Sequence, residues 1–279
     1  MEDDMPYIRI KGLETYYECQ GAGPPVVLLH NGFSCGMMWD EVVPLIIAAG
    51  FRAIVYDRRG YGRSDGGPDF EEHYVGETFR DESVSALMAL MDHLEIGRFH
   101  IVGQCEGGVV GVDAAAGHPD RVMTLSAAST LCTSPGPMDA FNRLKFPAAF
   151  EDLPAAVQQK YVHWHGRQRA AAFFQLCSRY GGCYGKDRFD LSPRLAAVRC
   201  PTLVMYPDRG HFFEVEQGVA FYRRLADGEL SVFPKCGHNI FEHYPERYAQ
   251  EVVAFIGRHT GAFSSLIGGP AGTKFWQRR

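Results

Sequence analysis

Short runs of apolar residues alternate with amphipathic stretches through the first half of the chain. The runs are continuous, which is typical of parallel strands buried on both faces, and they cover 26–29, 52–56, 99–102 and 122–127. Apolar residues recur at helical spacing between them, in 39–49, 81–94 and 107–117. This alternation predicts a parallel sheet with right-handed crossovers, an α/β fold. Ahead of it, 7–10 and 15–19 predict a short hairpin.

The pattern changes after Ala128. The segment 131–197 is rich in aromatic side chains and helical patches, and no strand is evident in it. Strands and helices alternate again afterwards, at 202–206, 215–225, 229–233 and 248–259. The pattern therefore predicts four parts, a core in two pieces with a helical lid over the carboxyl edge of the sheet and a flexible tail: core 1–130, lid 131–197, core 198–259 and tail 260–279.

The composition is that of a soluble globular protein, with 46% hydrophobic and 22% charged residues. A net charge of −5 gives no electrostatic reason to expect nucleic acid or an anionic membrane surface as a partner. The acidic start and the lack of a long apolar run predict neither a signal peptide nor a membrane span, so we expect a cytoplasmic location. The eight cysteines are scattered, which favours reduced thiols over a disulfide framework.

The strongest chemical signal lies around Cys105. An apolar strand enters Gly103-Gln104-Cys105-Glu106-Gly107, and a helix of small residues leaves it. Glycines two before and two after the central residue remove Cβ atoms that would collide in a sharp turn. The central side chain then lies at a helix N-terminus, where an anion is favoured. This strand–turn–helix context is that of a nucleophile elbow, and with cysteine at its centre it predicts a thiol nucleophile.

Two later loops contain a candidate acid and a candidate base. Asp208 follows the strand predicted at 202–206. His238 follows the strand predicted at 229–233. Both therefore belong at the carboxyl edge of the sheet, where open α/β sheets place their sites. Because a thiol needs a base and the base needs an orienting group, the order nucleophile, acid, histidine predicts a Cys105–His238–Asp208 triad.

Other carboxylates near these motifs have roles that the sequence leaves open. Asp57 and Asp187 are alternatives as the acid of the triad, but Asp57 is better explained as an ion-pair partner of a loop arginine, Arg59 or Arg63. Glu106 has two interpretations. It satisfies the dipole of the helix that it begins, or it lies at the floor of a pocket and modulates the thiol or a polar substrate.

The motifs together resemble those of the α/β-hydrolase superfamily, over residues 5–259. The segment 30–33, His-Asn-Gly-Phe, resembles its oxyanion loop, and 57–64 resembles its D-x-R-G-x-G-x-S loop with one extra arginine. Gly237-His238 resembles its histidine loop. The departure is the cysteine at the elbow, which dienelactone hydrolases and some thioesterase-like or acyl-transferring members share. A Ser→Cys change made by design would leave the same pattern.

The resemblance implies covalent catalysis with no cofactor and no metal. Cys105 would attack an acyl carbonyl, and His238 would take its proton and later activate water or an acceptor. Asp208 would hold the imidazole, and the backbone N–H groups of Phe33 and Glu106 would hold the oxyanion. A thiolate beside an imidazolium at a helix N-terminus is expected to have a lowered pKa.

The expected reaction is hydrolysis or transfer of the acyl group of a small ester, lactone or thioester, through an acyl-thioester on the cysteine. Aromatic residues in 131–197 favour an apolar or aromatic substrate. The residues expected to bind it lie in and beside the motifs: His30, Asn31, Gln104, Trp164 and His211. The alternatives on the same fold are cleavage of a C–C bond in a β-diketone-like compound and a non-catalytic receptor for a small ligand. No nucleic acid or membrane partner is expected, and a homodimer stays open.

Overall fold

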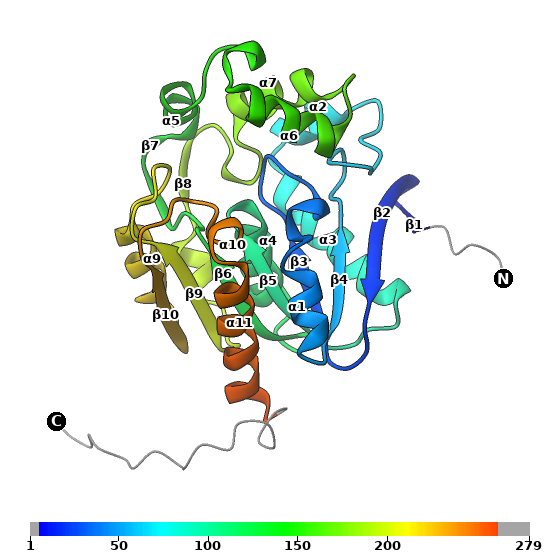
Figure 1. Ribbon diagram of the computed structural model, residues 1–279, viewed down its shortest axis with the longest axis vertical. Helices are drawn as coiled ribbons and strands as arrows, with labels where there is room; N and C mark the ends of the chain where they lie inside the picture. Colours follow the sequence, from blue (N-terminus) through cyan, green and yellow to red (C-terminus); the bar gives the residue numbers. More distant parts are fainter. Residues whose placement is uncertain (1–5, 262–279) are drawn as a thin grey trace.

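The computed structural model describes residues 6–261 (Figure 1). Within them the chain builds an eight-stranded sheet whose members are β1 (Tyr7–Ile10), β2 (Leu13–Gln20), β3 (Pro25–Leu29), β4 (Arg52–Tyr56), β5 (Phe99–Gln104), β6 (Val122–Ala128), β9 (Thr202–Pro207) and β10 (Gly228–Phe233). Their order in space is β1-β2-β4-β3-β5-β6-β9-β10. β1 and β2 pair antiparallel, as does β2 with β4, and the other neighbours are parallel. The predicted hairpin and parallel sheet are confirmed.

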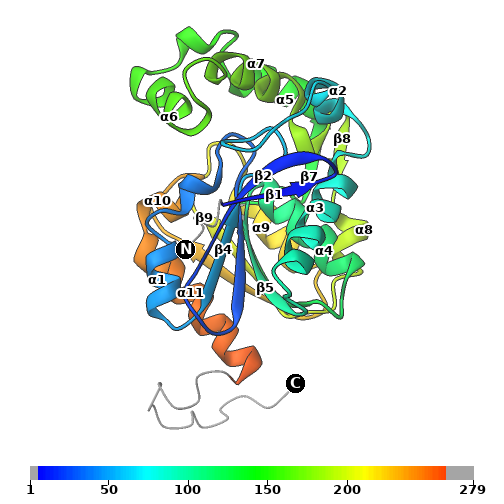
Figure 2. The ribbon, with the colours of Figure 1, turned by 90° about the vertical axis from the view of Figure 1, so that its right-hand side faces the viewer.

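Helices cover both faces of this sheet (Figure 2). On one face lie α1 (Val43–Ala48), α10 (Ile240–His243) and α11 (Pro245–Thr260). On the other lie α3 (Phe79–His93), α4 (Glu106–Gly117), α8 (Ser192–Leu195) and α9 (Val215–Tyr222). The central strand β3 shows the consequence, because Val26 and Leu28 belong to the core under the first group while Val27 and Leu29 belong to the core under the second. A continuous apolar run is therefore what a strand in this position requires.

The helical insertion, residues 131–190 between β6 and α8, lies above the carboxyl ends of the strands (Figures 1 and 2). It contains α5 (Met138–Lys145), η2 (Phe150–Asp152), α6 (Ala155–His165), α7 (Ala170–Tyr180) and η3 (Gly182–Tyr184). The expectation of no strand there is wrong. β7 (Thr133–Pro137) and β8 (Arg188–Asp190) pair antiparallel at its two ends. The sequence of β7, Thr-Ser-Pro-Gly-Pro, lacks the apolar alternation that reveals a strand.

Two helices in the first half of the chain also differ from the expectation. The α-helix predicted at 39–49 begins only at Val43, as α1, after a separate turn η1 (Gly36–Trp39), since Pro44 is accommodated only in the first turn of a helix. A short helix, α2 (Phe70–Val75), has no counterpart in the prediction. Most of the predicted tail, 262–279, lies outside the described residues. Among the helices of 6–261, none is both long and apolar enough to cross a bilayer.

The buried histidines of this fold should make its stability fall in acid. Burial lowers the pKa of His100 and of His165 to about 4, that of His238 to about 3, and that of His30 well below its ordinary value. The unfolded chain takes up protons near pH 6.5 whereas these folded side chains do not. We therefore expect the free energy of unfolding to fall by about 1 kcal/mol per histidine between pH 6.5 and pH 5.5. Urea unfolding at the two pH values measures this, and equal stability at both would contradict it.

Candidate active site

Cys105 lies in the sharp turn between β5 and α4. Its φ is +54° and its ψ is −114°, a backbone conformation that residues other than glycine rarely adopt. Its N–H donates to the carbonyl of Ala128 at 2.8 Å, which ties the turn to β6. A Cβ on Gly103 would overlap the backbone of Gly107, so the tight approach of strand and helix requires glycine there. The turn has the strand–turn–helix geometry that the sequence predicted.

The sulfur of Cys105 borders a pocket of about 420 Å³ between the strand ends and the helical insertion. Half of the residues around it are aromatic or aliphatic, among them Phe33, Phe141, Phe146, Tyr161, Trp164, Phe174, Phe212 and Phe213. Of the residues expected to bind substrate, Asn31, Trp164 and His211 line this pocket. The pocket therefore matches an apolar or aromatic ligand with a few polar groups.

His238 lines the same pocket, on the loop after β10. Its backbone carbonyl accepts hydrogen bonds from Gln104 Nε2 at 2.9 Å and from Ser129 Oγ at 2.8 Å. Gln104 thus holds the histidine loop instead of facing the pocket. The imidazole lies against the rings of Phe212 and Phe213, with centroids 5.2 and 5.5 Å away. Burial lowers its pKa to about 3, so the ring is neutral near pH 7 and can accept a proton.

The structure does not bring Asp208 to the imidazole of His238. The backbone N–H groups of Lys235 and Cys236 face its carboxylate and hold its pKa below the ordinary value, and Arg209 lies 3.7 Å away. Across residues 6–261, Nδ1 of His238 is buried without a hydrogen-bond partner. Asp208 therefore braces the turn that leads to the histidine, and contact between the second and third members of the expected triad is absent from the described part of the chain.

The alternative acids also lie elsewhere. Asp57 forms the ion pair that the sequence predicted, with its Oδ2 3.0 Å from Nε of Arg63. Its Oδ1 accepts the N–H of Gly36 at 2.7 Å, so this carboxylate joins two loops at the carboxyl edge of the sheet. Asp187 is exposed beside β8. Neither has a hydrogen bond to His238 among the described residues.

One of the two expected oxyanion donors is already engaged. The N–H of Phe33 donates to Oδ1 of Asn31 at 2.9 Å, as does the N–H of Ser34. The N–H of Glu106, by contrast, faces Sγ of Cys105. Of the two backbone donors, that of Glu106 is the one directed at the sulfur.

A buried ion pair lies beside the sulfur. Oε2 of Glu106 is 3.3 Å from Nη2 of Arg58, and the two side chains are only 4% and 3% exposed. Arg58 also donates to the carbonyl of Asn31 at 2.9 Å, and its backbone N–H donates to Nε2 of His30 at 3.0 Å. His30 is therefore fixed below the loop and does not line the pocket, whereas Glu106 does. Glu106 matches the second interpretation, that of a carboxylate at the pocket floor.

The thiol of Cys105 is protonated near pH 7. Burial raises its pKa to about 12, a hydrogen bond with Tyr184 lowers it in part, and the Glu106 carboxylate raises it. The expectation of a lowered thiol pKa is wrong, because burial favours the neutral thiol, the Glu106 carboxylate adds to this effect, and His238 is neutral. Attack by the sulfur must therefore be coupled to the loss of its proton.

Tyr184 contacts the sulfur, and the sequence carries no local signal for it. Its Oη lies 3.5 Å from Sγ of Cys105, and its ring lines the pocket. The residue follows Gly181-Gly182-Cys183, in a segment without helical or strand periodicity. Only the aromatic enrichment of 131–197 points toward it.

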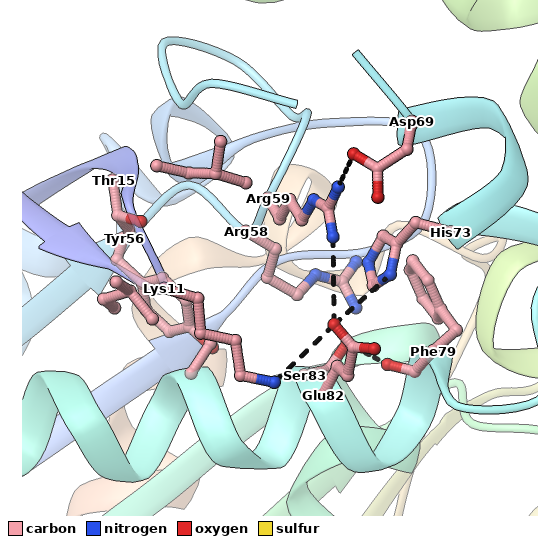
Figure 3. A pocket seen from close by; sticks show the side chains of 13 residues that line it. Lys11, Thr15, Tyr56, Arg58, Arg59, Asp69, His73, Phe79, Glu82 and Ser83 are labelled. Atoms are coloured by element: carbon pink, nitrogen blue, oxygen red, sulfur yellow. Dashed lines mark hydrogen bonds and ion pairs between the residues drawn. The ribbon is translucent and has the colours of Figure 1, made fainter. Parts of the chain in front are cut away.

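Arg58 also borders a second pocket, of about 210 Å³ (Figure 3). There Glu82 faces Lys11, Arg59 and His73 at 3.5–3.8 Å. Because this carboxylate and these cations are paired with one another, we assign the chemistry to the larger pocket.

Comparison with known proteins places this site in a family context. A family model described as "alpha/beta hydrolase fold" matches residues 24–162. A proline iminopeptidase of Lactobacillus crispatus is 34% identical, over 93% of this chain and 99% of the relative. A 2-hydroxy-6-oxo-6-phenylhexa-2,4-dienoate hydrolase of Burkholderia cepacia is 25% identical, over 83% of this chain and 88% of the relative. Among solved structures, a meta-cleavage product hydrolase of Pseudomonas fluorescens matches with a TM-score of 0.74, over 90% of this chain and 97% of that one. At 18% identity this match shows that the two proteins share a fold.

Removal of one partner of the buried ion pair should strongly lower the free energy of unfolding, because the other charge stays buried without a partner. Glu106→Ala leaves the charge of Arg58 buried and unpaired, so we expect a loss of about 3–5 kcal/mol in the free energy of unfolding. In the double variant Arg58→Met/Glu106→Leu the loss should be smaller than the sum of the losses in the single variants Arg58→Met and Glu106→Leu, measured by urea unfolding as a double-mutant cycle. Glu242→Ala, which removes the more exposed pair with Lys160, is the control and should cost less than about 1 kcal/mol. Additive losses at Arg58 and Glu106 would contradict the expectation.

Proposed function

The chain belongs to the α/β-hydrolase family, and from that premise we propose that it hydrolyses or transfers the acyl group of a small ester, lactone or thioester through an acyl-thioester on Cys105. One observation carries the proposal. A strained turn holds the sulfur at the N-terminus of α4 and at the wall of a 420 Å³ pocket that also contains His238. Nucleophile and base in one mostly apolar pocket is the arrangement that covalent acyl transfer needs.

The proposed reaction begins with coupled proton transfer. As the sulfur of Cys105 forms a bond to the carbonyl carbon, its proton passes to His238 and the carbonyl electron pair moves onto oxygen. The leaving alcohol or thiol takes that proton when its bond to the carbon breaks. Water or another acceptor then attacks the acyl-thioester, and the thiol is restored.

The two pKa values determine which substrates suit this site. The thiol of Cys105 has a pKa of about 12 and the imidazole of His238 one of about 3. Burial disfavours the charged form of both groups, so complete proton transfer before attack is costly. Activated carbonyls, such as thioesters and strained lactones, require the least charge build-up before bond formation, so they are the preferred substrates.

A second candidate is hydrolysis of a C–C bond in a β-diketone-like compound. The likeness over most of the chain to the Burkholderia cepacia enzyme, whose name specifies 2-hydroxy-6-oxo-6-phenylhexa-2,4-dienoate, favours it. The neutral base His238 and the aromatic pocket suit either substrate class. A non-catalytic receptor would bind a ligand in the same pocket without multiple turnovers.

Intact-protein mass spectrometry tests the covalent mechanism. Brief exposure to a panel of acyl-thioesters, lactones, aryl esters and 2-hydroxy-6-oxo-6-phenylhexa-2,4-dienoate should give one acyl adduct, which peptide mapping places on Cys105. Cys105→Ala should form none, whereas the control Cys200→Ala, which removes a buried thiol outside the pocket, should react as the parent does. Turnover that survives Cys105→Ala would overturn the thiol mechanism. Turnover of the dienoate alone, without an adduct, would select the C–C candidate, and binding without turnover would select the receptor.

Replacement of Asp208 tests whether an acid orients the base. Because the backbone of Lys235 and Cys236 faces its carboxylate, Asp208→Asn keeps an acceptor there, and we expect kcat/KM to fall by less than about 10-fold. His238→Asn should lower kcat/KM by about 10²- to 10⁴-fold, since it removes the general base. Equal losses in steady-state assays of the two variants would mean that Asp208 orients the imidazole during turnover.

A further inference from the structure

The hydroxyl of Tyr184 approaches the nucleophile from outside the α/β core. Oη lies 3.5 Å from Sγ of Cys105, and the tyrosine belongs to η3 in the helical insertion. We propose that Tyr184 is a catalytic residue whose O–H donates a hydrogen bond to the negative charge that develops on this sulfur as its proton leaves. The inference rests on the proposed function for the identity of the nucleophile.

Two observations favour Tyr184 as the donor of this hydrogen bond once the sulfur becomes anionic. The N–H of Leu131 donates to Oη of Tyr184 at 3.4 Å, so the oxygen already serves as an acceptor there and its own proton is available to the sulfur. Burial raises the pKa of Tyr184 well above its ordinary value, so the phenol keeps its proton throughout the working range of pH. While the thiol keeps its proton either group can donate, but once the sulfur is anionic only the tyrosine can donate, and the sulfur is then its acceptor.

Glu106 holds the tyrosine in place. Its Oε1 accepts the N–H of Cys183, the residue before Tyr184, at 3.1 Å. A Cβ on Gly182 would overlap the same carboxylate, so glycine is needed for the loop to approach it. The ring of Tyr184 also packs edge-on against Phe189, with centroids 4.8 Å apart. Glu106 is thus a positioning residue that fixes the loop of the donor and begins the helix of the nucleophile.

The site needs such a donor. The backbone donor that faces the sulfur is the N–H of Glu106. The carboxylate of Glu106 at the same time opposes a negative charge on Cys105. A hydrogen bond from a neutral phenol offsets that repulsion without adding a charge to the pocket.

Tyr184→Phe tests the donor because it removes the hydroxyl and keeps the ring. We expect the rate of alkylation of Cys105 by iodoacetamide, followed at fixed pH by peptide mapping, to fall by about 10- to 100-fold, which is the worth of one hydrogen bond to a charged group. For acyl transfer, kcat should fall by a similar factor while KM stays unchanged, since the hydrogen bond strengthens only as the sulfur becomes anionic.

The matched control is Tyr248→Phe. Tyr248 is fully buried, its hydroxyl has no hydrogen-bond partner within 6–261, and it packs against Trp39 on the opposite face of the sheet. This variant should alkylate and turn over as the parent does. Glu106→Gln keeps an acceptor for the N–H of Cys183 but removes the negative charge. Iodoacetamide should therefore alkylate Cys105 faster in this variant than in the parent.

Three outcomes are informative. A folded Tyr184→Phe, with an unchanged urea midpoint, that alkylates and turns over like the parent would overturn the proposal. Slower alkylation together with a lower kcat and an unchanged KM would support it. Slower alkylation in a protein that never forms an acyl adduct would support the donor while removing the proposed acyl chemistry, so the two failures can be told apart.

Discussion

The ion pair between Arg58 and Glu106 is the interaction on which the site depends. Two opposite charges out of contact with water are stable only if each also has well-placed hydrogen bonds. Those bonds come from different parts of the chain: the carbonyl of Asn31 accepts from Arg58, and the hydroxyl of Tyr61 and the N–H of Cys183 donate to Glu106. The pair therefore joins four segments, namely the loop after β3, the loop after β4, the elbow and the helical insertion.

This constraint changes the chemistry that the elbow would otherwise have. A helix N-terminus and a neighbouring imidazolium would favour a thiolate, but burial, a carboxylate at the next residue and a neutral His238 favour the thiol. The site is built around a protonated nucleophile and a weak base. The negative charge on the sulfur therefore has to be stabilised as it develops in the reaction. A neutral hydrogen-bond donor that contacts the sulfur serves that purpose, since it interacts weakly with the thiol and strongly with the anion.

How far the sequence predicts this structure depends on the range of the interactions involved. The continuous apolar run at Val26–Leu29 and the glycines around Cys105 are local signals, and they predicted the strand and the turn. Contacts across the fold leave no such trace. Tyr184 reaches a sulfur 79 residues earlier in the chain, and the placement of Asp208 depends on a turn at Lys235. The pKa of the thiol could not be predicted either, because burial, its largest cause, is a property of the packed structure.

The ribbon of β7 and β8 has a consequence for how such a protein can diversify. Because Thr133 pairs with Asp190, the two ends of the intervening segment lie side by side at the edge of the core. The segment between them can change in length and composition without shifting the register of any core strand, because its ends stay fixed by the pairing of β7 with β8. In this chain that segment contains one part of the pocket wall, including Phe146 and Trp164, and it also contains Tyr184. A single exchange would therefore alter substrate range and the environment of the nucleophile together, and selection would act on the two traits as one.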